Sequence, residues 1–168
     1  TFLLFSSAAN QVIDVLLIGT YGTAVAPPTL KIDLYLGSTL IGTTGAVSLV
    51  AVTGTSNGWW LRSSIIITAI GASGSVECDG YGVFSTTTTA GLPVYIPGTS
   101  TGSINFNADE ALTAKITWGT ANASSTITCR EFIVHSETVG SGGGSGGFAS
   151  PTILTANTNN TLAISTAY

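Results

Sequence analysis

Hydrophobic and polar residues alternate along much of this 168-residue chain. In the segment 29–36, leucine or isoleucine stands at every even position, and Lys31, Asp33 and Tyr35 stand between them. Successive side chains of a β-strand point to opposite faces, so this pattern predicts a strand with one dry face and one wet face. Gly37 and Ser38 then predict a tight turn into a second strand at 39–43, which completes a hairpin.

The same alternation predicts further strands elsewhere in the chain. Their ranges are Val12 to Tyr21, Trp59 to Ile70, Ser75 to Phe84, Leu112 to Trp118 and Ser125 to His135. No stretch repeats hydrophobic residues at the spacing of a helix. Eight or more short strands joined by short loops predict an all-β fold, an antiparallel β-sandwich. Long tryptophan-bearing strands that cross between the sheets favour a jelly-roll-like arrangement over an up-and-down barrel.

The chain is expected to divide into a sandwich domain at 1–139, a linker at 140–147 and a β extension at 148–168. The linker prediction rests on the sequence GSGGGSGG, because glycine has no side chain to pack and loses much conformational entropy on ordering. Strand-like patterns resume at 152–156 and 161–166. An isolated hairpin is not stable in water, so we expect the extension to add to the sandwich or to a neighbouring copy.

Some predicted strands are apolar on both faces. A strand with one solvent-exposed face should instead alternate apolar and polar residues. The segment 47–52 is one, and the others are two runs of three residues, Leu16-Leu17-Ile18 and Ile65-Ile66-Ile67. Either both faces are covered within the domain or the outward face contacts another copy. The six residues of the two runs are our candidate subunit interface. They favour an obligate homo-oligomer, for which a trimer is the expectation by analogy.

Composition supports an assembling protein more than a catalyst. Only 7% of the residues are charged, against about 25% in an ordinary domain, while 44% are hydrophobic and the mean hydropathy is +0.49. Low charge leaves little repulsion between copies and few groups for proton transfer. The net charge of −4, with four scattered basic residues, argues against nucleic acid. No apolar run reaches the roughly 18 residues of a membrane helix, so no membrane insertion is expected.

Candidate catalytic groups are few, and we expect no enzyme and no cofactor. His135 is the only histidine and stands beside Ser136 and Glu137, but adjacent residues of one strand cannot converge as a catalytic triad. Glu77 and Asp79 share one strand face roughly 7 Å apart. They could form a glycosidase pair or bind calcium, but a solvated strand face is the favoured interpretation.

Cys78 and Cys129 stand about 50 positions apart, outside any Cys-x-x-Cys motif. Buried free thiols are favoured over a disulfide, and a metal site from two isolated cysteines and one histidine is improbable.

Aromatic residues offer a second kind of site. Trp59, Trp60 and Tyr81, with Tyr95 and Trp118, could form a platform on which sugar rings stack, as in carbohydrate-binding modules. Consecutive side chains of a strand point to opposite faces, so one of the two adjacent tryptophans must be a core residue if the other is exposed. Use of these rings in the core or in a subunit interface is the favoured alternative.

Several motifs resemble structural proteins of tailed-bacteriophage virions. They are the run GWWLR at 58–62 with the isoleucine-rich strand after it, IGASGSV at 70–76, the pair Gly80-Tyr81, and the segments 111–118 and 121–129. The resemblance covers about 12–135 and departs at the glycine-rich segment. It implies a β-sandwich module of a fibre, decoration or minor tail protein, located on the extracellular particle surface. The partners of such a module would be capsid or tail proteins and host-surface glycans. The resemblance assigns no catalytic residues to this chain.

Two other functions compete with this one. A carbohydrate-binding module would use the aromatic side chains. A glycan depolymerase would use Glu77 and Asp79, and it is the least favoured of the three.

Overall fold

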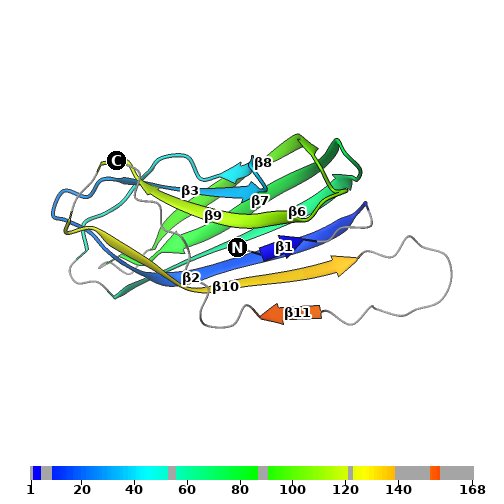
Figure 1. The fold of residues 1–168 in the computed structure, drawn as a ribbon. Coiled ribbons are helices and arrows are strands. Elements are labelled where there is room, and N and C mark those ends of the chain that lie inside the picture. The colour runs from blue at the N-terminus through cyan, green and yellow to red at the C-terminus, as the bar shows by residue number, and fades with distance from the viewer. Residues whose placement is uncertain are drawn as a thin grey trace.

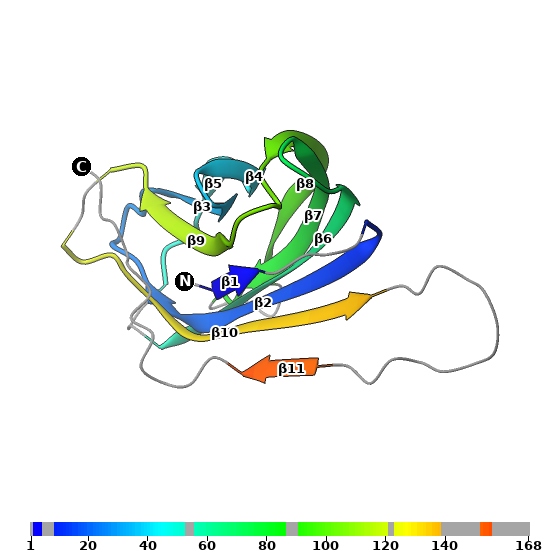
Figure 2. The same cartoon turned by 45° about the vertical axis from the view of Figure 1, so that its right-hand side comes forward.

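The computed structural model describes residues 2–4, 9–52, 56–86, 91–120, 123–138 and 152–155. Within them the chain forms strands and no helix, arranged as two antiparallel sheets that face each other (Figure 1). This confirms the prediction of an all-β, antiparallel two-sheet sandwich. The turned view in Figure 2 shows the two layers most clearly, with β3, β4, β5 and β9 above β2 and β10.

The larger sheet has six strands in the order β11-β10-β2-β6-β7-β8. Their bounds are Thr152–Thr155 for β11, Thr126–Thr138 for β10, Gln11–Gly22 for β2, Asn57–Ala69 for β6, Gly74–Phe84 for β7 and Leu92–Ile104 for β8. The smaller, five-stranded sheet has the order β1-β9-β3-β4, and β5 also pairs with β3. Their bounds are Phe2–Leu4 for β1, Glu110–Trp118 for β9, Thr29–Leu36 for β3, Thr39–Thr43 for β4 and Val47–Ser48 for β5.

The chain passes from one sheet to the other after β1, β2, β5, β8 and β9. In contrast, β6, β7 and β8 follow one another as an antiparallel meander in the larger sheet. The hairpin predicted at 29–43 is present as β3 and β4. Gly37 forms its turn with φ of 60°, a left-handed backbone conformation that glycine adopts without steric cost.

The core lies between the two sheets and is made by alternate residues of the long strands. Its largest side chains, Trp59, Tyr21 and Phe84, are fully buried. The rings of Trp59 and Phe84 stack with centroids 5.7 Å apart, and Tyr21 meets Phe84 edge-on at 5.0 Å. Each large side chain that is removed from water contributes about 1.5–3 kcal/mol, so this aromatic cluster is a main source of stability.

Asp33 departs from the expected wet face of β3. It is 1% exposed, and its carboxylate is satisfied by Lys31 Nζ at 2.8 Å and by a 2.6 Å hydrogen bond that the Thr43 hydroxyl donates. The same contact with Asp33 raises the pKa of Lys31. A buried carboxylate needs such partners. Here Thr43 of the neighbouring strand β4 and Lys31, two positions earlier in β3, supply them.

The C-terminal predictions fall only partly on described residues. The strand predicted at 152–156 corresponds to β11, which pairs antiparallel with β10 at the edge of the larger sheet. The predicted linker at 140–147 and the predicted strand at 161–166 lie outside the described residues.

Candidate binding face on the six-stranded sheet

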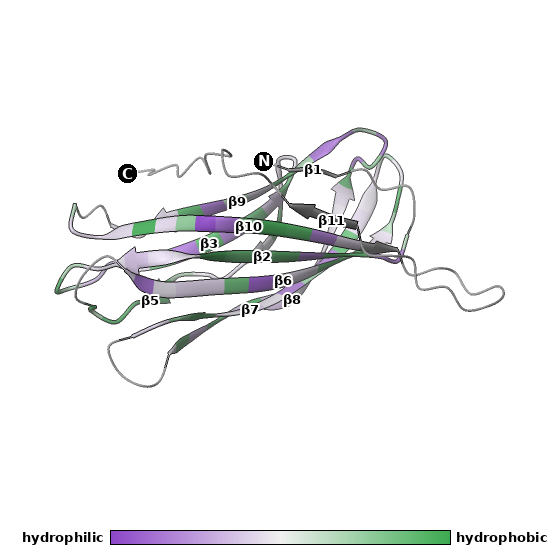
Figure 3. Cartoon of the chain, turned by 90° about the horizontal axis from the view of Figure 1, so that it is seen from below, coloured by the Kyte–Doolittle hydropathy of each residue, from purple (hydrophilic) through white to green (hydrophobic). Residues whose placement is uncertain are grey.

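The outer face of the six-stranded sheet carries the side chains that point away from the core, and we call it the outer face from here on. Strand β2 shows how it arises: Ile13, Val15 and Leu17 are buried between the sheets, whereas Leu16 and Ile18 point outward and are half-buried. Figure 3 views the molecule from this side, where β2 and β10 carry long hydrophobic runs.

The structure divides the six predicted interface residues into two groups. Leu17, Ile65 and Ile67 are at most 1% exposed and belong to the chain's own core, so the expectation for these three is corrected. Leu16, Ile18 and Ile66 lie on the outer face, where Ile66 is 38% exposed. The reason is the two-residue period of a strand, which sends alternate members of an apolar run to opposite faces.

The segment 47–52 divides in the same way. Leu49 and Val52 are buried in the core, whereas Val50 is 47% exposed.

Three aromatic side chains form a row across the outer face, which we call the aromatic row. Trp60 of β6, Tyr81 of β7 and Tyr95 of β8 are 37%, 43% and 59% exposed. The ring centroids lie 5.4 Å apart between Trp60 and Tyr81, and 5.3 Å apart between Tyr81 and Tyr95. The pairing of β7 with β8 places the two tyrosines directly opposite each other. Of the five aromatic residues considered for the glycan platform, the structure thus gathers three: Trp60, Tyr81 and Tyr95.

The other two tryptophans do not belong to this row. Trp59 is 1% exposed, and its indole N–H donates a 3.2 Å hydrogen bond to the Thr128 carbonyl, so its predicted glycan contact is corrected to a core position. Trp118 ends β9 in the other sheet and packs, half-buried, against the core.

A hollow opens beside the aromatic row. It has a volume of about 570 Å³, and its lining includes Trp60, Tyr81, Arg62, Ser64 and Asp79. The backbone register between β7 and β8 shifts between Cys78 and Gly80, directly along this hollow. Such irregularities often re-aim side chains next to binding sites.

An ion-pair network fixes the polar side of the hollow. The Arg62 guanidinium lies 3.1 Å from one carboxylate oxygen of Asp14, and the Ser64 hydroxyl donates a 2.6 Å hydrogen bond to the other. Partial burial acts to raise the pKa of Asp14, but the hydrogen bonds from Ser64 and Arg62 and the charges of Arg62 and His135 lower it overall. Asp14 therefore stays ionised at neutral pH and holds Arg62 in place.

Glu77 and Asp79 are both exposed on the outer face, as the alternation of β7 predicted. They line a second hollow of about 360 Å³ that also includes Ser64, Ile66 and Thr99. Among the described residues, no group of three or more acidic, histidine or cysteine side chains gathers as a metal site.

His135 also lies on the outer face, in register with Asp14 of β2 and beside a small hollow that Arg62 and Ile133 line. Its neighbour Ser136 accepts a 2.7 Å hydrogen bond from the Gln11 side-chain amide. Because His135 and Ser136 are consecutive in a strand, their side chains point to opposite faces, and no serine–histidine pair forms.

The two cysteines are free thiols on strands that do not neighbour each other. Cys78 of β7 and Cys129 of β10 are separated by β2 and β6. Neighbouring strands lie about 4.8 Å apart, which puts the two about 14 Å apart across the sheet, beyond the roughly 7 Å reach of a disulfide. Burial raises the pKa of both thiols, so neither has the character of a reactive nucleophile.

No family model matches the chain, and neither a curated protein nor a solved structure matches it significantly. The resemblance to virion proteins thus depends on the sequence motifs alone. In the part of the chain that the structure describes, no helix is long and apolar enough to cross a membrane.

Proposed function

We propose that the chain is a non-enzymatic structural module of a tailed-bacteriophage virion, which assembles as a homo-oligomer through its outer face. In this proposal the fold is a jelly-roll-like sandwich whose sequence continues into the glycine- and serine-rich linker predicted at 140–147. The module is a capsid decoration, head-fibre, tail or tail-fibre component on the particle surface. Other virion proteins would be its partners, and a trimer is the favoured form. The sequence resemblance supports the virion setting, and the exposed apolar side chains of the outer face support its use in assembly.

The observation that carries the proposal is the exposure of Ile66. This side chain is 38% exposed on a strand that buries Ile65 and Ile67 completely. Leu16 and Ile18 give the neighbouring strand β2 the same apolar outer face. Covering apolar surface contributes about 25 cal/mol for each Å² removed from water. A second copy placed on this face would gain that free energy, and the low charge of the chain would oppose its approach little.

Light scattering coupled to size-exclusion chromatography tests this proposal. The chain should elute as an oligomer at micromolar concentration. Ile66→Lys should shift it toward the monomer without unfolding it, because the new ammonium can pair with Glu77 on the neighbouring strand β7. Leu40→Lys is the matched control, since Leu40 is 42% exposed but lies on β4 of the other sheet. A stable monomer at these concentrations, or equal effects of both variants, would contradict the proposal.

A second candidate function is favoured by the aromatic row. Exposed aromatic rings beside fixed polar groups are typical of carbohydrate-binding surfaces, where the apolar face of a sugar covers a ring and its hydroxyls meet polar groups. The chain would then be a β-sandwich module that contacts host-surface glycans. Binding to a glycan array that is lost in Trp60→Ala, with folding intact, would support this function, and absence of binding across a broad array would exclude it.

A further inference from the structure

We infer that the hollow beside Trp60 and Tyr81 binds uncharged sugars and discriminates against anionic ones. This inference rests on the second candidate function and adds to it the chemical class of the ligand. Three features of the hollow carry it: the angles between its rings, the polar groups that line it, and the sign of its charge.

The aromatic row is bent, not flat. The ring planes of Trp60 and Tyr81 meet at 73°, and those of Tyr81 and Tyr95 at 49°. Coplanar rings would suit a long polysaccharide that lies flat across several of them. Two rings at a steep angle instead form a corner, in which one ring lies against the apolar face of a sugar and the other closes its edge. This geometry fits one or a few sugar units.

The polar groups of the hollow suit sugar hydroxyls, which both donate and accept hydrogen bonds. Arg62 supplies donors, and its contact with Asp14 orders the guanidinium before any ligand arrives. Asp79 supplies an acceptor, and its carboxylate is exposed on the same wall. A group that is ordered in advance loses less conformational entropy on binding, so this arrangement favours affinity.

The charge of the hollow selects among sugars. Its single guanidinium, Arg62, is already paired with Asp14, and Asp79 places a carboxylate in the lining itself. Glu77 adds another at the adjoining hollow, which shares Ser64 and Asp79 with the first. An acidic sugar would bring its own carboxylate into this negative region, where Arg62, the cation among the described lining residues, is already paired with Asp14. Like-charge contact opposes such a ligand, whereas an uncharged sugar meets no such penalty.

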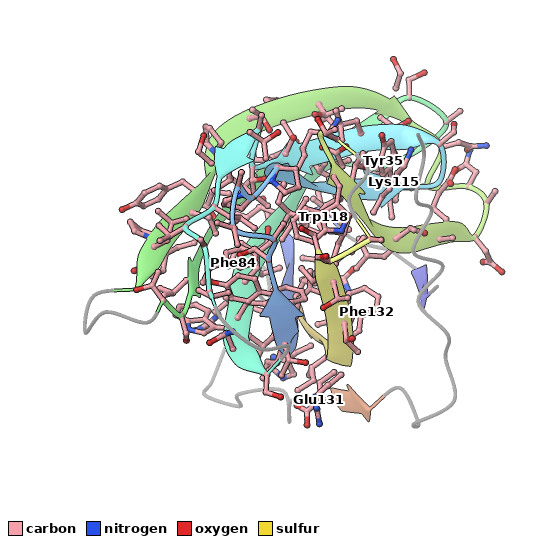
Figure 4. All side chains as sticks on the ribbon, turned by 90° about the vertical axis from the view of Figure 1, so that its left-hand side faces the viewer. Tyr35, Phe84, Lys115, Trp118, Glu131 and Phe132 are labelled. Atoms are coloured by element: carbon pink, nitrogen blue, oxygen red, sulfur yellow. The ribbon has the colours of Figure 1, made fainter. Side chains whose placement is uncertain are left out.

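A panel of glycans that differ only in charge tests the inference. We expect binding to neutral oligosaccharides and at least about tenfold weaker binding to the same scaffolds capped with a uronic or sialic acid. Trp60→Ala and Tyr81→Ala should each lower the affinity for the neutral ligand about tenfold or more. Tyr35→Ala is the matched control, because Tyr35 lies on β3 of the five-stranded sheet and not on the sheet that carries Trp60 and Tyr81 (Figure 4). Asp79→Asn should reduce the difference in affinity between neutral and anionic ligands.

The possible outcomes distinguish failure of this inference from failure of the glycan-binding function on which it rests. Glycan binding could depend on Trp60 and yet be equal for neutral and anionic ligands, or stronger for anionic ones. Either result would overturn the selectivity for uncharged sugars and leave the glycan function in place. Loss of affinity in Tyr35→Ala equal to that in Trp60→Ala would overturn the site. No binding to any member of the panel would overturn both the site and the glycan function, while the proposal of an oligomer, which light scattering tests, would stand independently.

Discussion

Trp59 and Trp60 are consecutive residues of β6, yet their side chains lie on opposite faces of the larger sheet. Trp59 is 1% exposed and stacks on Phe84 in the core. Trp60 is 37% exposed and meets Tyr81 on the outer face. One step along the chain therefore separates a residue that stabilises the fold from a residue that is available for binding.

Truncation of the two tryptophans should have unequal effects on stability. Trp59→Ala should lower the free energy of unfolding by about 3–5 kcal/mol, because it leaves a large cavity and removes the hydrogen bond to the Thr128 carbonyl. Trp60→Ala should lower it by about 1 kcal/mol, as for an average substitution. Urea denaturation at low protein concentration measures both values, with an unchanged denaturant slope as the check on two-state unfolding. Equal losses would show that the two residues are not divided between core and surface.

Gly19 marks a close approach between β2 and β10. A Cβ built at this position would clash with the Thr128 carbonyl oxygen and would lie 2.7 Å from the Trp59 indole nitrogen that donates to it. Gly19→Ala should therefore destabilise the fold by about 1–3 kcal/mol, in the range of overpacked cores. Gly98→Ala is the control, since nothing lies within 4 Å of the Cβ it would add. Thermal unfolding compares the two, and a tolerated Gly19→Ala would contradict the described pairing of β2 with β10.

The Asp14 network predicts a specific pH dependence. The pKa of Asp14 in the folded chain lies below its ordinary value of 3.8. A lowered carboxylate pKa contributes stability that is complete above the ordinary value and is lost as the pH falls through the folded value. Asp14→Asn should therefore be less stable than the native chain near neutral pH, and the difference should shrink in strong acid.

Denaturant titrations at several pH values measure this difference. Asp109→Asn serves as the control, because Asp109 is an exposed residue of the loop before β9. A gap between the native chain and Asp14→Asn that stays constant into strong acid would show that ionised Asp14 is not the source of the stability.

The sequence predicted the fold class and most strands because a period of two is a direct consequence of strand geometry. The segments 29–36 and 39–43 match β3 and β4 in their bounds. Strand β8 was missed. Its first half alternates Val94 and Ile96 with Tyr95, but the stretch from Gly98 to Ser103 is polar throughout and gives no hydrophobic pattern.

The candidate site was predictable only in part. Alternation required the two adjacent tryptophans to face opposite sides, but it could not say which of them was exposed. That depends on which face of β6 the second sheet covers, which is a property of the tertiary fold. Likewise, the contact of Arg62 with Asp14 joins β6 to β2 across 48 positions of sequence, and no local spacing indicates it. Tyr95 joins Tyr81 only because β8 pairs with β7.

The central claim is that the outer face of the six-stranded sheet is the surface through which the chain binds its partners. Hydroxyl-radical footprinting read out by mass spectrometry tests this claim most directly. It compares the oxidation of side chains in the assembled or glycan-bound chain with their oxidation in the free monomer. The account predicts that oxidation of Trp60, Tyr81 and Ile66 falls on binding, while oxidation of Tyr35 and Leu40 on the other sheet stays the same. Protection of Tyr35 and Leu40 with Trp60, Tyr81 and Ile66 unprotected would contradict it.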